Sequence, residues 1–143
     1  MFGDDYMAFR QYAAIDSKYR LRIPSQTGVE KGEKLYLLYN CDKTHLVLSK
    51  AKTLIEKIER LEEECSETED TERYKKLSRD KEYYCSLIIQ VFTVDQEKRI
   101  LLGRKNKGLI GNNPSRVFLF GQMNEIGLFN DEEEFKKLYG LTI

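Results

Sequence analysis

The stretch Ala-Ile-Asp-Ser-Lys-Tyr-Arg-Leu-Arg-Ile-Pro occupies residues 14–24, and a weaker copy, Thr-Val-Asp-Gln-Glu-Lys-Arg-Ile-Leu-Leu-Gly, occupies residues 93–103. In each copy an aspartate follows a β-branched residue and precedes an arginine by four positions, which gives the pairs Asp16 with Arg20 and Asp95 with Arg99. An apolar alternation begins after each arginine. This pattern predicts a strand, a tight turn and a second strand in each copy.

The repeat extends beyond these turns. After each turn come two glycines, two apolar runs separated by a polar break, and a helix-like segment that begins at Ser49 in the first half and at Asn130 in the second. Because the order of elements is the same twice, we expect a tandem repeat whose halves share one core, since each half alone is small. The predicted fold class is α+β, with residues 1–143 as one compact domain: a first repeat at 8–50, a helical connection at 51–85, and a second repeat with a terminal helix at 86–143.

Apolar residues at helical spacing locate the first helix of the connection. Ser49 is its expected N-cap, and the amphipathic stripe consists of Leu54, Ile55, Ile58 and Leu61. This stripe is interpreted as core or inter-subunit packing.

A second helix is expected from about residue 71 to residue 83, with Tyr74 and Leu77 facing inward. The period then changes, and residues 87–94 are expected to form a strand. Acidic residues at 131–134 are well placed for the N-terminus of the terminal helix.

Composition indicates a folded, non-membrane protein. Hydrophobic residues make up 41% of the 143-residue chain and charged residues 34%. No apolar run approaches the roughly 20 residues that a membrane helix needs. The N-terminal residues lack the basic and apolar regions of a signal peptide, so a cytoplasmic location is expected.

The chain offers little for metal or redox chemistry. Cys41, Cys65 and Cys85 are odd in number and form no Cys-x-x-Cys pair, so they are interpreted as buried or incidental thiols in a reducing compartment. His45 is the only histidine and begins an apolar run, which favours a local structural role. We expect no cofactor and no bound metal.

Charge is segregated along the chain although the net charge is zero. Residues 62–72 contain seven acidic side chains and no basic one, whereas residues 95–116 contain six basic side chains and two acidic ones. Such segregation suits a protein that turns one face toward a polyanion and keeps another in water. Two ordinary solvated surfaces would explain the charges equally well.

The Asp-x-x-x-Arg stretches and their surroundings resemble a known kind of domain. Residues 15–24, followed by Val-Glu-Lys-Gly-Glu-Lys-Leu-Tyr-Leu at 29–37, are similar to the AbrB-like swapped-hairpin domain (SpoVT-AbrB) of prokaryotic transcription factors. Two such units separated by helices in a chain of this length resemble the MraZ family, and the resemblance covers nearly the whole chain.

The resemblance implies a fold, an assembly and a function. The two repeats would interlock like a dimer within one chain, in a double-psi-like β-barrel, and copies would assemble into a homo-oligomeric ring. Members of the family bind repeated boxes of double-stranded DNA near their own promoter, usually as repressors of the division and cell-wall gene cluster. A nucleoid-associated location in the cytoplasm would follow, with no membrane and no small-molecule substrate as partner.

The residues provide candidates for that interface. Strand alternation places Arg20 and Arg22 on one face and the apolar Leu21 and Ile23 on the other. Arginine can bind guanine or phosphate, and an aspartate can orient the guanidinium or hold the turn. We assign DNA contact to Arg20, Arg22 and Arg99, phosphate contact to Lys18, Lys98, Arg104 and Lys105, and turn geometry to Asp16 and Asp95. The competing interpretation of each Asp–Arg pair is an exposed salt bridge without function, worth about 0.2 to 1 kcal/mol.

The chain departs from the family pattern at three positions. The family has glycine before the arginine, where this chain has Tyr19 and Lys98, and proline where the second copy has Gly103. Either the turns differ from the family's, or two non-glycine residues accept a positive φ.

Two other functional classes stay open. The first is a diverged oligomeric scaffold or interaction protein that has lost DNA binding. The second is an enzyme, which is disfavoured because the sequence has no nucleophile elbow, phosphate loop or metal-ligand spacing and only one histidine. We therefore expect a protein that is not an enzyme.

Overall fold

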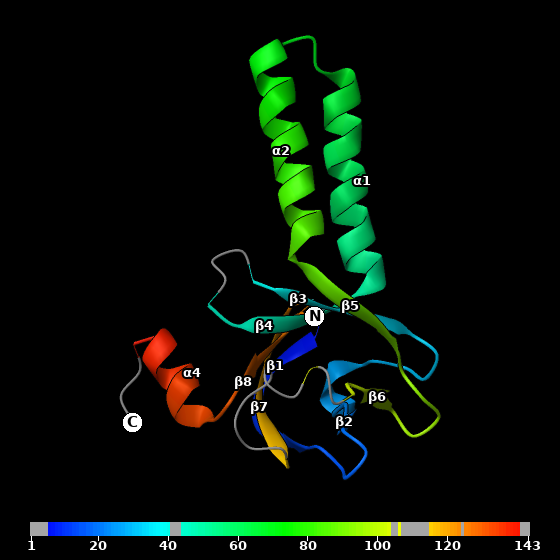
Figure 1. Cartoon of the computed structure of the whole chain (residues 1–143), viewed down its shortest axis with the longest axis vertical. Coiled ribbons are helices and arrows are strands. Elements are labelled where there is room, and N and C mark those ends of the chain that lie inside the picture. Colours follow the sequence, from blue (N-terminus) through cyan, green and yellow to red (C-terminus); the bar gives the residue numbers. More distant parts are fainter. Residues whose placement is uncertain (1–5, 41–43, 104–105, 107–114, 124, 141–143) are drawn as a thin grey trace.

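The computed structural model describes residues 6–40, 44–103, 106, 115–123 and 125–140. These residues form an α+β fold with three α-helices and an open antiparallel sheet of six strands, as Figure 1 shows. The elements are β1 (Tyr6–Ala14), β2 (Arg20–Arg22), the 3₁₀ helix η1 (Ser25–Thr27), β3 (Lys34–Tyr39), β4 (Leu46–Lys50), α1 (Ala51–Glu67), α2 (Thr71–Leu87), β5 (Ile88–Thr93), β6 (Arg99–Leu101), β7 (Arg116–Met123), β8 (Glu125–Phe129) and α4 (Glu132–Leu138).

The large sheet interleaves strands from both halves of the chain. Its order is β1-β7-β8-β4-β3-β5. The order is symmetric between the repeats: β1 corresponds to β5, β3 to β7 and β4 to β8. Replacing each strand by its counterpart gives the same order read from the other edge of the sheet. Strand β1 therefore pairs with β7 of the second half, and β5 pairs with β3 of the first half.

The small sheet joins the two repeats directly. Strand β2 pairs antiparallel with β6, with Leu21 opposite Ile100 at the centre, and both of these side chains are fully buried. The flanking backbone bonds are made twice in equivalent places. The amide of Ile23 donates to the carbonyl of Lys98 at 2.8 Å, and the amide of Leu102 donates to the carbonyl of Tyr19 at 2.9 Å.

The core lies between the large and the small sheet. Its main cluster draws on both repeats and includes Leu21, Ile23, Leu35, Leu37, Leu48, Ile100, Leu102, Val117, Leu119 and Ile126. The alternation predicted for the first hairpin is confirmed, since Leu21 and Ile23 are buried while Arg22 is exposed.

Helices α1 and α2 form an antiparallel hairpin that projects from the sheet (Figure 1). The predicted N-cap of α1 was wrong: Ser49 belongs to β4 and is buried, and Lys50 takes the cap position, where its side chain does not cap the helix. The apolar stripe is confirmed only in part. Leu54 is buried, but Ile55 is 44% exposed because α1 rises away from the sheet.

Helix α2 is longer than predicted. It begins at Thr71, capped by Asp70, and runs to Leu87 rather than ending near residue 83. Neither proline nor glycine interrupts the additional turn, and Leu87 is buried at its end. Leu77 faces inward as predicted, whereas the prediction for Tyr74 was wrong, since this side chain is 50% exposed.

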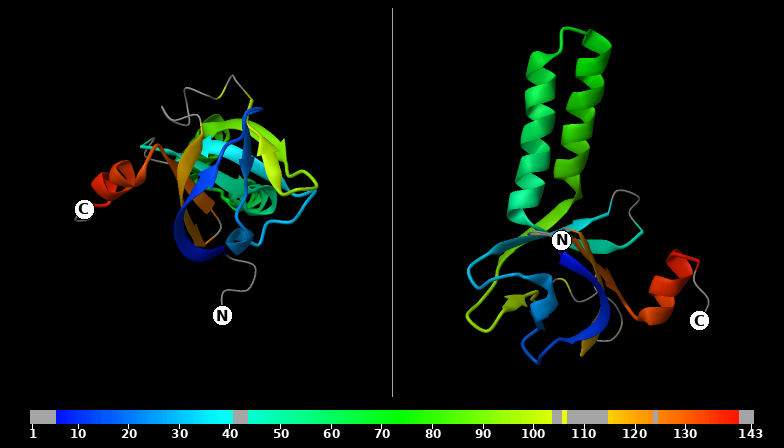
Figure 2. Two further views of the ribbon diagram at one scale, coloured as in Figure 1. Left: turned by 90° about the horizontal axis from the view of Figure 1, so that it is seen from below. Right: turned by 180° about the vertical axis from the view of Figure 1, so that it is seen from behind.

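The helical hairpin separates the acidic residues from the small sheet. The acidic run at 62–72 lies at the tip of the hairpin, where α1 ends and α2 begins. Figures 1 and 2 place β2 and β6 at the opposite end of the molecule. The acidic run and the basic residues of β2 and β6 therefore lie at opposite ends of the molecule.

Helix α4 begins as the sequence predicts. The Asp131 carboxylate accepts a hydrogen bond from the Glu134 amide at 2.9 Å, and three glutamates occupy the first turn. On its inner side the buried Phe135 packs against Phe118 and Phe129.

His45 has a packing role. Its ring stacks on Phe129 with 4.6 Å between centroids, and Nδ1 lies 2.9 Å from the Thr44 hydroxyl. Burial lowers the pKa of His45. Cys65 and Cys85 are free, and Cys41 lies outside the described residues.

Two searches of the described residues found nothing. No group of three or more His, Cys, Asp and Glu side chains among them could hold a metal ion. None of the described helices is long and apolar enough to cross a membrane.

Truncating the centre of the small sheet should destabilise the whole protein. We expect Leu21→Ala to lower the free energy of unfolding by about 2 to 5 kcal/mol, because it leaves a cavity under both repeats. The control Leu101→Ala removes a side chain that is 59% exposed and should change it by less than about 0.5 kcal/mol. Urea unfolding measures both values, and equal effects would contradict the shared core.

Candidate nucleic-acid interface

The first Asp-x-x-x-Arg turn is held by one carboxylate. Oδ1 of Asp16 accepts the amides of Lys18 at 2.9 Å and Arg20 at 3.0 Å, and Oδ2 accepts Nε of Arg20 at 2.7 Å. The backbone closes the same turn, because the Tyr19 amide donates to the Asp16 carbonyl and the Asp16 amide to the Arg20 carbonyl. The four-residue spacing is what lets one side chain reach all three donors.

The second turn repeats this arrangement. Oδ1 of Asp95 accepts the amides of Glu97 at 2.9 Å and Arg99 at 2.8 Å, and Oδ2 accepts Nε of Arg99 at 3.0 Å. The turn roles predicted for Asp16 and Asp95 thus match the observed contacts.

Both turns pass through the left-handed region at a residue other than glycine. The φ angle is 58° at Tyr19 and 59° at Lys98. Of the two alternatives that the sequence left open, the chain therefore adopts the one in which Tyr19 and Lys98 accept a positive φ. The Tyr19 side chain is partly buried and packs against the main core, which compensates some of the cost of this conformation.

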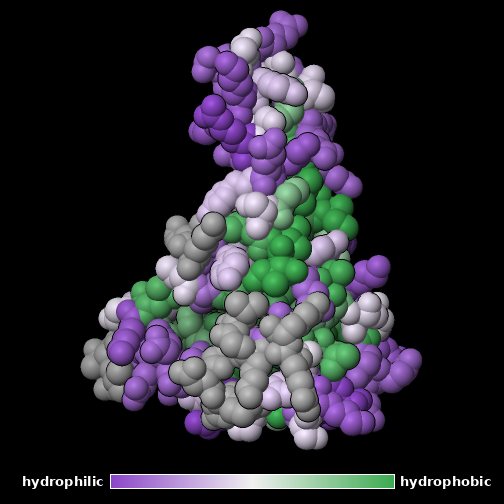
Figure 3. Space-filling model, viewed as in Figure 1, coloured by the Kyte–Doolittle hydropathy of each residue, from purple (hydrophilic) through white to green (hydrophobic). Residues whose placement is uncertain are grey.

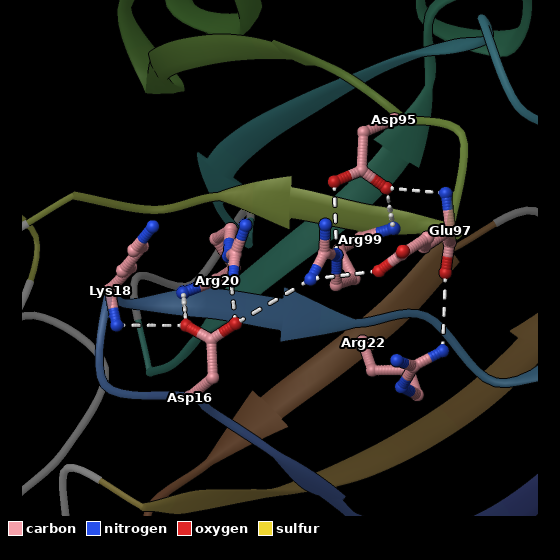
Figure 4. Close-up of polar contacts among 7 residues, drawn as sticks. All are labelled: Asp16, Lys18, Arg20, Arg22, Asp95, Glu97 and Arg99. Carbon is pink, nitrogen blue, oxygen red and sulfur yellow. Dashed lines mark hydrogen bonds and ion pairs between the residues drawn. The ribbon is translucent and has the colours of Figure 1, made fainter.

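Pairing of β2 with β6 brings the two turns together, as Figure 4 shows. We call β2, β6 and the turns at 16–20 and 95–99 the ribbon. Arg22 lies opposite Arg99 in its register. Across the ribbon, Nη1 of Arg99 lies 3.9 Å from Oδ2 of Asp16, so an ion pair connects the two motifs.

The two halves of the ribbon differ in charge. Glu97 occupies the position that Lys18 holds in the first turn, and its Oε2 lies 2.9 Å from Nη1 of Arg99. The Glu97 carbonyl also accepts a hydrogen bond from Nη1 of Arg22 at 3.2 Å. Leu101 stands where the first copy has Arg22. The first half is therefore the more basic one.

Most of the residues predicted for the interface lie together on the ribbon. They are Asp16, Lys18, Arg20, Arg22, Asp95, Lys98 and Arg99. Arg104 and Lys105 lie outside the described residues. Glu97 was not predicted from the sequence as a residue of the interface. Aligning the two copies would have shown it, because Glu97 is equivalent to Lys18 and has the opposite charge.

Hydrogen bonding lowers the pKa of both turn aspartates. Partial burial acts to raise the pKa of Asp16, but the Arg20 amide and guanidinium and the Lys18 amide outweigh it and hold the pKa below its usual range. The pKa of Asp95 is lowered in the same way, by the amides of Arg99 and Glu97 and the Arg99 guanidinium.

The ribbon presents a recognisable class of surface: a two-stranded antiparallel β-ribbon with arginines along one face. Comparison of the chain with models of known protein families found no match, and comparison with curated proteins found none.

Replacing the second left-handed residue by glycine should stabilise the protein. A residue with a side chain costs about 1 to 2 kcal/mol in the left-handed conformation, and glycine removes this cost. Glycine also gives the unfolded chain more conformational entropy, which offsets part of the stabilisation. We expect Lys98→Gly to raise the free energy of unfolding by about 0.5 to 1 kcal/mol. Urea unfolding of Lys98→Ala is the control, since alanine keeps the strain. Equal stability of the glycine and alanine variants would contradict the explanation.

Acid should weaken the turns. A carboxyl whose pKa is lowered by folding binds fewer protons in the folded state than in the unfolded state. Its contribution to the free energy of unfolding is therefore complete above the ordinary pKa of 3.8 and is lost as the pH falls through the lowered pKa of the folded state. The double variant Asp16→Asn with Asp95→Asn should be less stable than the wild type at pH 7. The difference should narrow below pH 3.8 in urea unfolding series, and a constant difference would contradict this assignment.

Proposed function

We propose that the protein is a sequence-specific DNA-binding transcriptional regulator and that the ribbon is its DNA-contacting surface. One observation carries this proposal: the pairing of β2 with β6 sets Arg20, Arg22 and Arg99 along one outward face. Antiparallel β-ribbons fit the major groove of DNA, where arginine can bind guanine in a bidentate manner.

The aspartates would prepare the arginines for binding. Each carboxylate binds Nε of its arginine. A guanidinium held through Nε, as in Arg20, can still offer its two terminal nitrogens to a guanine or a phosphate, whereas Nη1 of Arg99 is already paired with Glu97. Fixing the side chain before binding lowers the entropy lost on binding. Lys18 and Lys98, at the turns, would contact phosphates.

The resemblance to the MraZ family supports the finer part of the proposal. By this resemblance the two repeats form a double-psi-like barrel, copies of the chain assemble into a ring, and the ring binds repeated promoter boxes. The regulated genes would be the division and cell-wall cluster, the effect repression, and the location the nucleoid.

An oligomer would compensate for the modest charge of one copy. The ribbon carries five cations against three carboxylates, and the chain as a whole is neutral. Several copies that bind successive boxes gain affinity through effective concentration, without any new contact at each ribbon.

A second candidate is a scaffold or interaction protein that has lost DNA binding. The ion pair of Glu97 with Arg99 at 2.9 Å favours it, because this carboxylate neutralises one of the three arginines. Under this hypothesis the Asp–Arg pairs only hold the fold.

Removing two arginines should separate these functions. We expect Arg20→Ala with Arg99→Ala to weaken binding to the repeat-containing upstream DNA by at least about tenfold and to lower the salt slope by about 0.9 for each phosphate that the variant no longer neutralises. The measurement is a fluorescence anisotropy titration at several salt concentrations. Lys52→Ala, exposed on α1, is the control. Unchanged affinity in the double variant would remove the DNA assignment.

Glu97→Lys completes the experiment from the opposite direction. It restores the charge of Lys18 to the second turn and releases Arg99, so a DNA-binding protein should bind more tightly and with a steeper salt slope. A scaffold would show no sequence-dependent binding in either variant.

A further inference from the structure

One exposed apolar side chain lies on the arginine face of the ribbon. Leu101 in β6 is 59% exposed, the largest fraction among the large hydrophobic side chains that the structure describes. It pairs with Arg20 across the ribbon, and Arg99 precedes it by two positions on the same strand. Side chains two positions apart on a strand share a face, and the intervening Ile100 is buried. Leu101 therefore points outward together with Arg99.

The hydrogen-bond register brings Leu101 close to the arginine opposite. The backbone bonds that flank the ribbon join residue 19 to residue 102 and residue 23 to residue 98, so these two pairs are hydrogen-bonded. Hydrogen-bonded and non-hydrogen-bonded pairs alternate along an antiparallel ladder, which makes Arg20 and Leu101 a non-hydrogen-bonded pair. The side chains of such a pair lie closer together than those of a hydrogen-bonded pair. Leu101 thus belongs to the same surface as the arginines.

Apolar surface elsewhere on the molecule has apolar neighbours. Figure 3 shows that such surface gathers below the helical hairpin, which is itself mostly hydrophilic. The half-exposed ring of Tyr139, at the end of α4, contacts the rings of Phe129 and Phe135. Leu101 differs, because its neighbours on the outward face of the ribbon are arginines. A leucine that stays mostly in water contributes little to folding, so packing within the chain does not account for it.

Leu101 also breaks the symmetry of the ribbon. Aligning the two copies makes Arg20 equivalent to Arg99, and Arg22 equivalent to Leu101. A guanidinium can donate to a base or to a phosphate, whereas the side chain of leucine can donate to neither. In the major groove an apolar side chain has one favourable partner, the 5-methyl group of thymine. The two ends of the ribbon are therefore suited to different bases.

We propose that Leu101 is a specificity-determining residue that contacts the 5-methyl group of a thymine in the major groove. The arginines beside it bring this face of the ribbon against the DNA, and the contact then removes both the leucine and the methyl group from water. The inference rests on the proposed function and identifies a base feature that the ribbon reads.

Replacing thymine by uracil tests the contact, because uracil lacks the 5-methyl group and keeps the base pairing. We expect the wild type to bind a uracil copy of the repeat-containing upstream DNA about three- to fivefold more weakly for each thymine contacted, the factor that burial of one methyl group provides. Leu101→Ala should bind the thymine duplex more weakly than the wild type and should not distinguish the two duplexes. Fluorescence anisotropy gives the four affinities, which form a double-mutant cycle.

Val91→Ala is the matched control. Val91 is 46% exposed on β5, outside the ribbon, so this variant also loses an exposed apolar side chain from a strand. It should keep the wild-type affinity and the wild-type preference for the thymine duplex. Circular dichroism checks that Val91→Ala and Leu101→Ala fold.

Four results would overturn the inference. Equal affinity of the wild type for both duplexes would remove the methyl contact and leave the DNA assignment in place. An equal loss on uracil DNA in the wild type and in Leu101→Ala would assign the effect to another side chain or to the shape of the DNA. A lower mass of Leu101→Ala than of the wild type in light scattering without DNA would identify a contact between copies instead. A wild type that binds neither duplex would remove the inference together with the proposed function.

Discussion

Two aspartate carboxylates hold the backbone on which the rest of the structure depends. Each accepts two amides and one guanidinium, and so holds a turn whose third residue after the aspartate is left-handed. The carbonyls of those left-handed residues, Tyr19 and Lys98, accept hydrogen bonds from the opposite repeat. The residues in the strained left-handed conformation are thus the ones that join the two halves. The conformation persists because several hydrogen bonds together hold the backbone in it.

The two repeats share a backbone and differ in their side chains. Lys18 and Glu97 both donate their amides to the turn aspartate, yet they carry opposite charges. In the connection that follows, Thr27 and Asn106 are both buried, and each satisfies a nearby carbonyl with a different polar group. Backbone geometry tolerates such changes, so the two halves can differ in surface chemistry while remaining alike in fold.

Local patterns predicted local structure well. Alternation located the buried Leu21 and Ile23, and the acidic cluster located the start of α4. The errors have physical causes: Ser49 is a good cap by chemistry, but strand pairing with Glu125 keeps it in β4. The exchange of β1 and β5 between the repeats could not be predicted from these patterns, because alternation shows which face is buried and not which strand is the neighbour. The pairing of Glu97 with Arg99 likewise depends on the turn that brings them together.

The exchanged outer strands also govern when the chain can fold. Tyr12 of β1 pairs with Phe118 of β7, and Tyr36 of β3 pairs with Val91 of β5, so both partners are synthesised much later. During synthesis the first repeat therefore leaves the ribosome with unpaired strand edges and half a core. Among the described elements, the α1–α2 and β3–β4 hairpins have contacts close enough in sequence to form early. Non-local pairing slows folding and prolongs exposure of apolar edges, so the nascent chain is the form most vulnerable to aggregation and proteolysis.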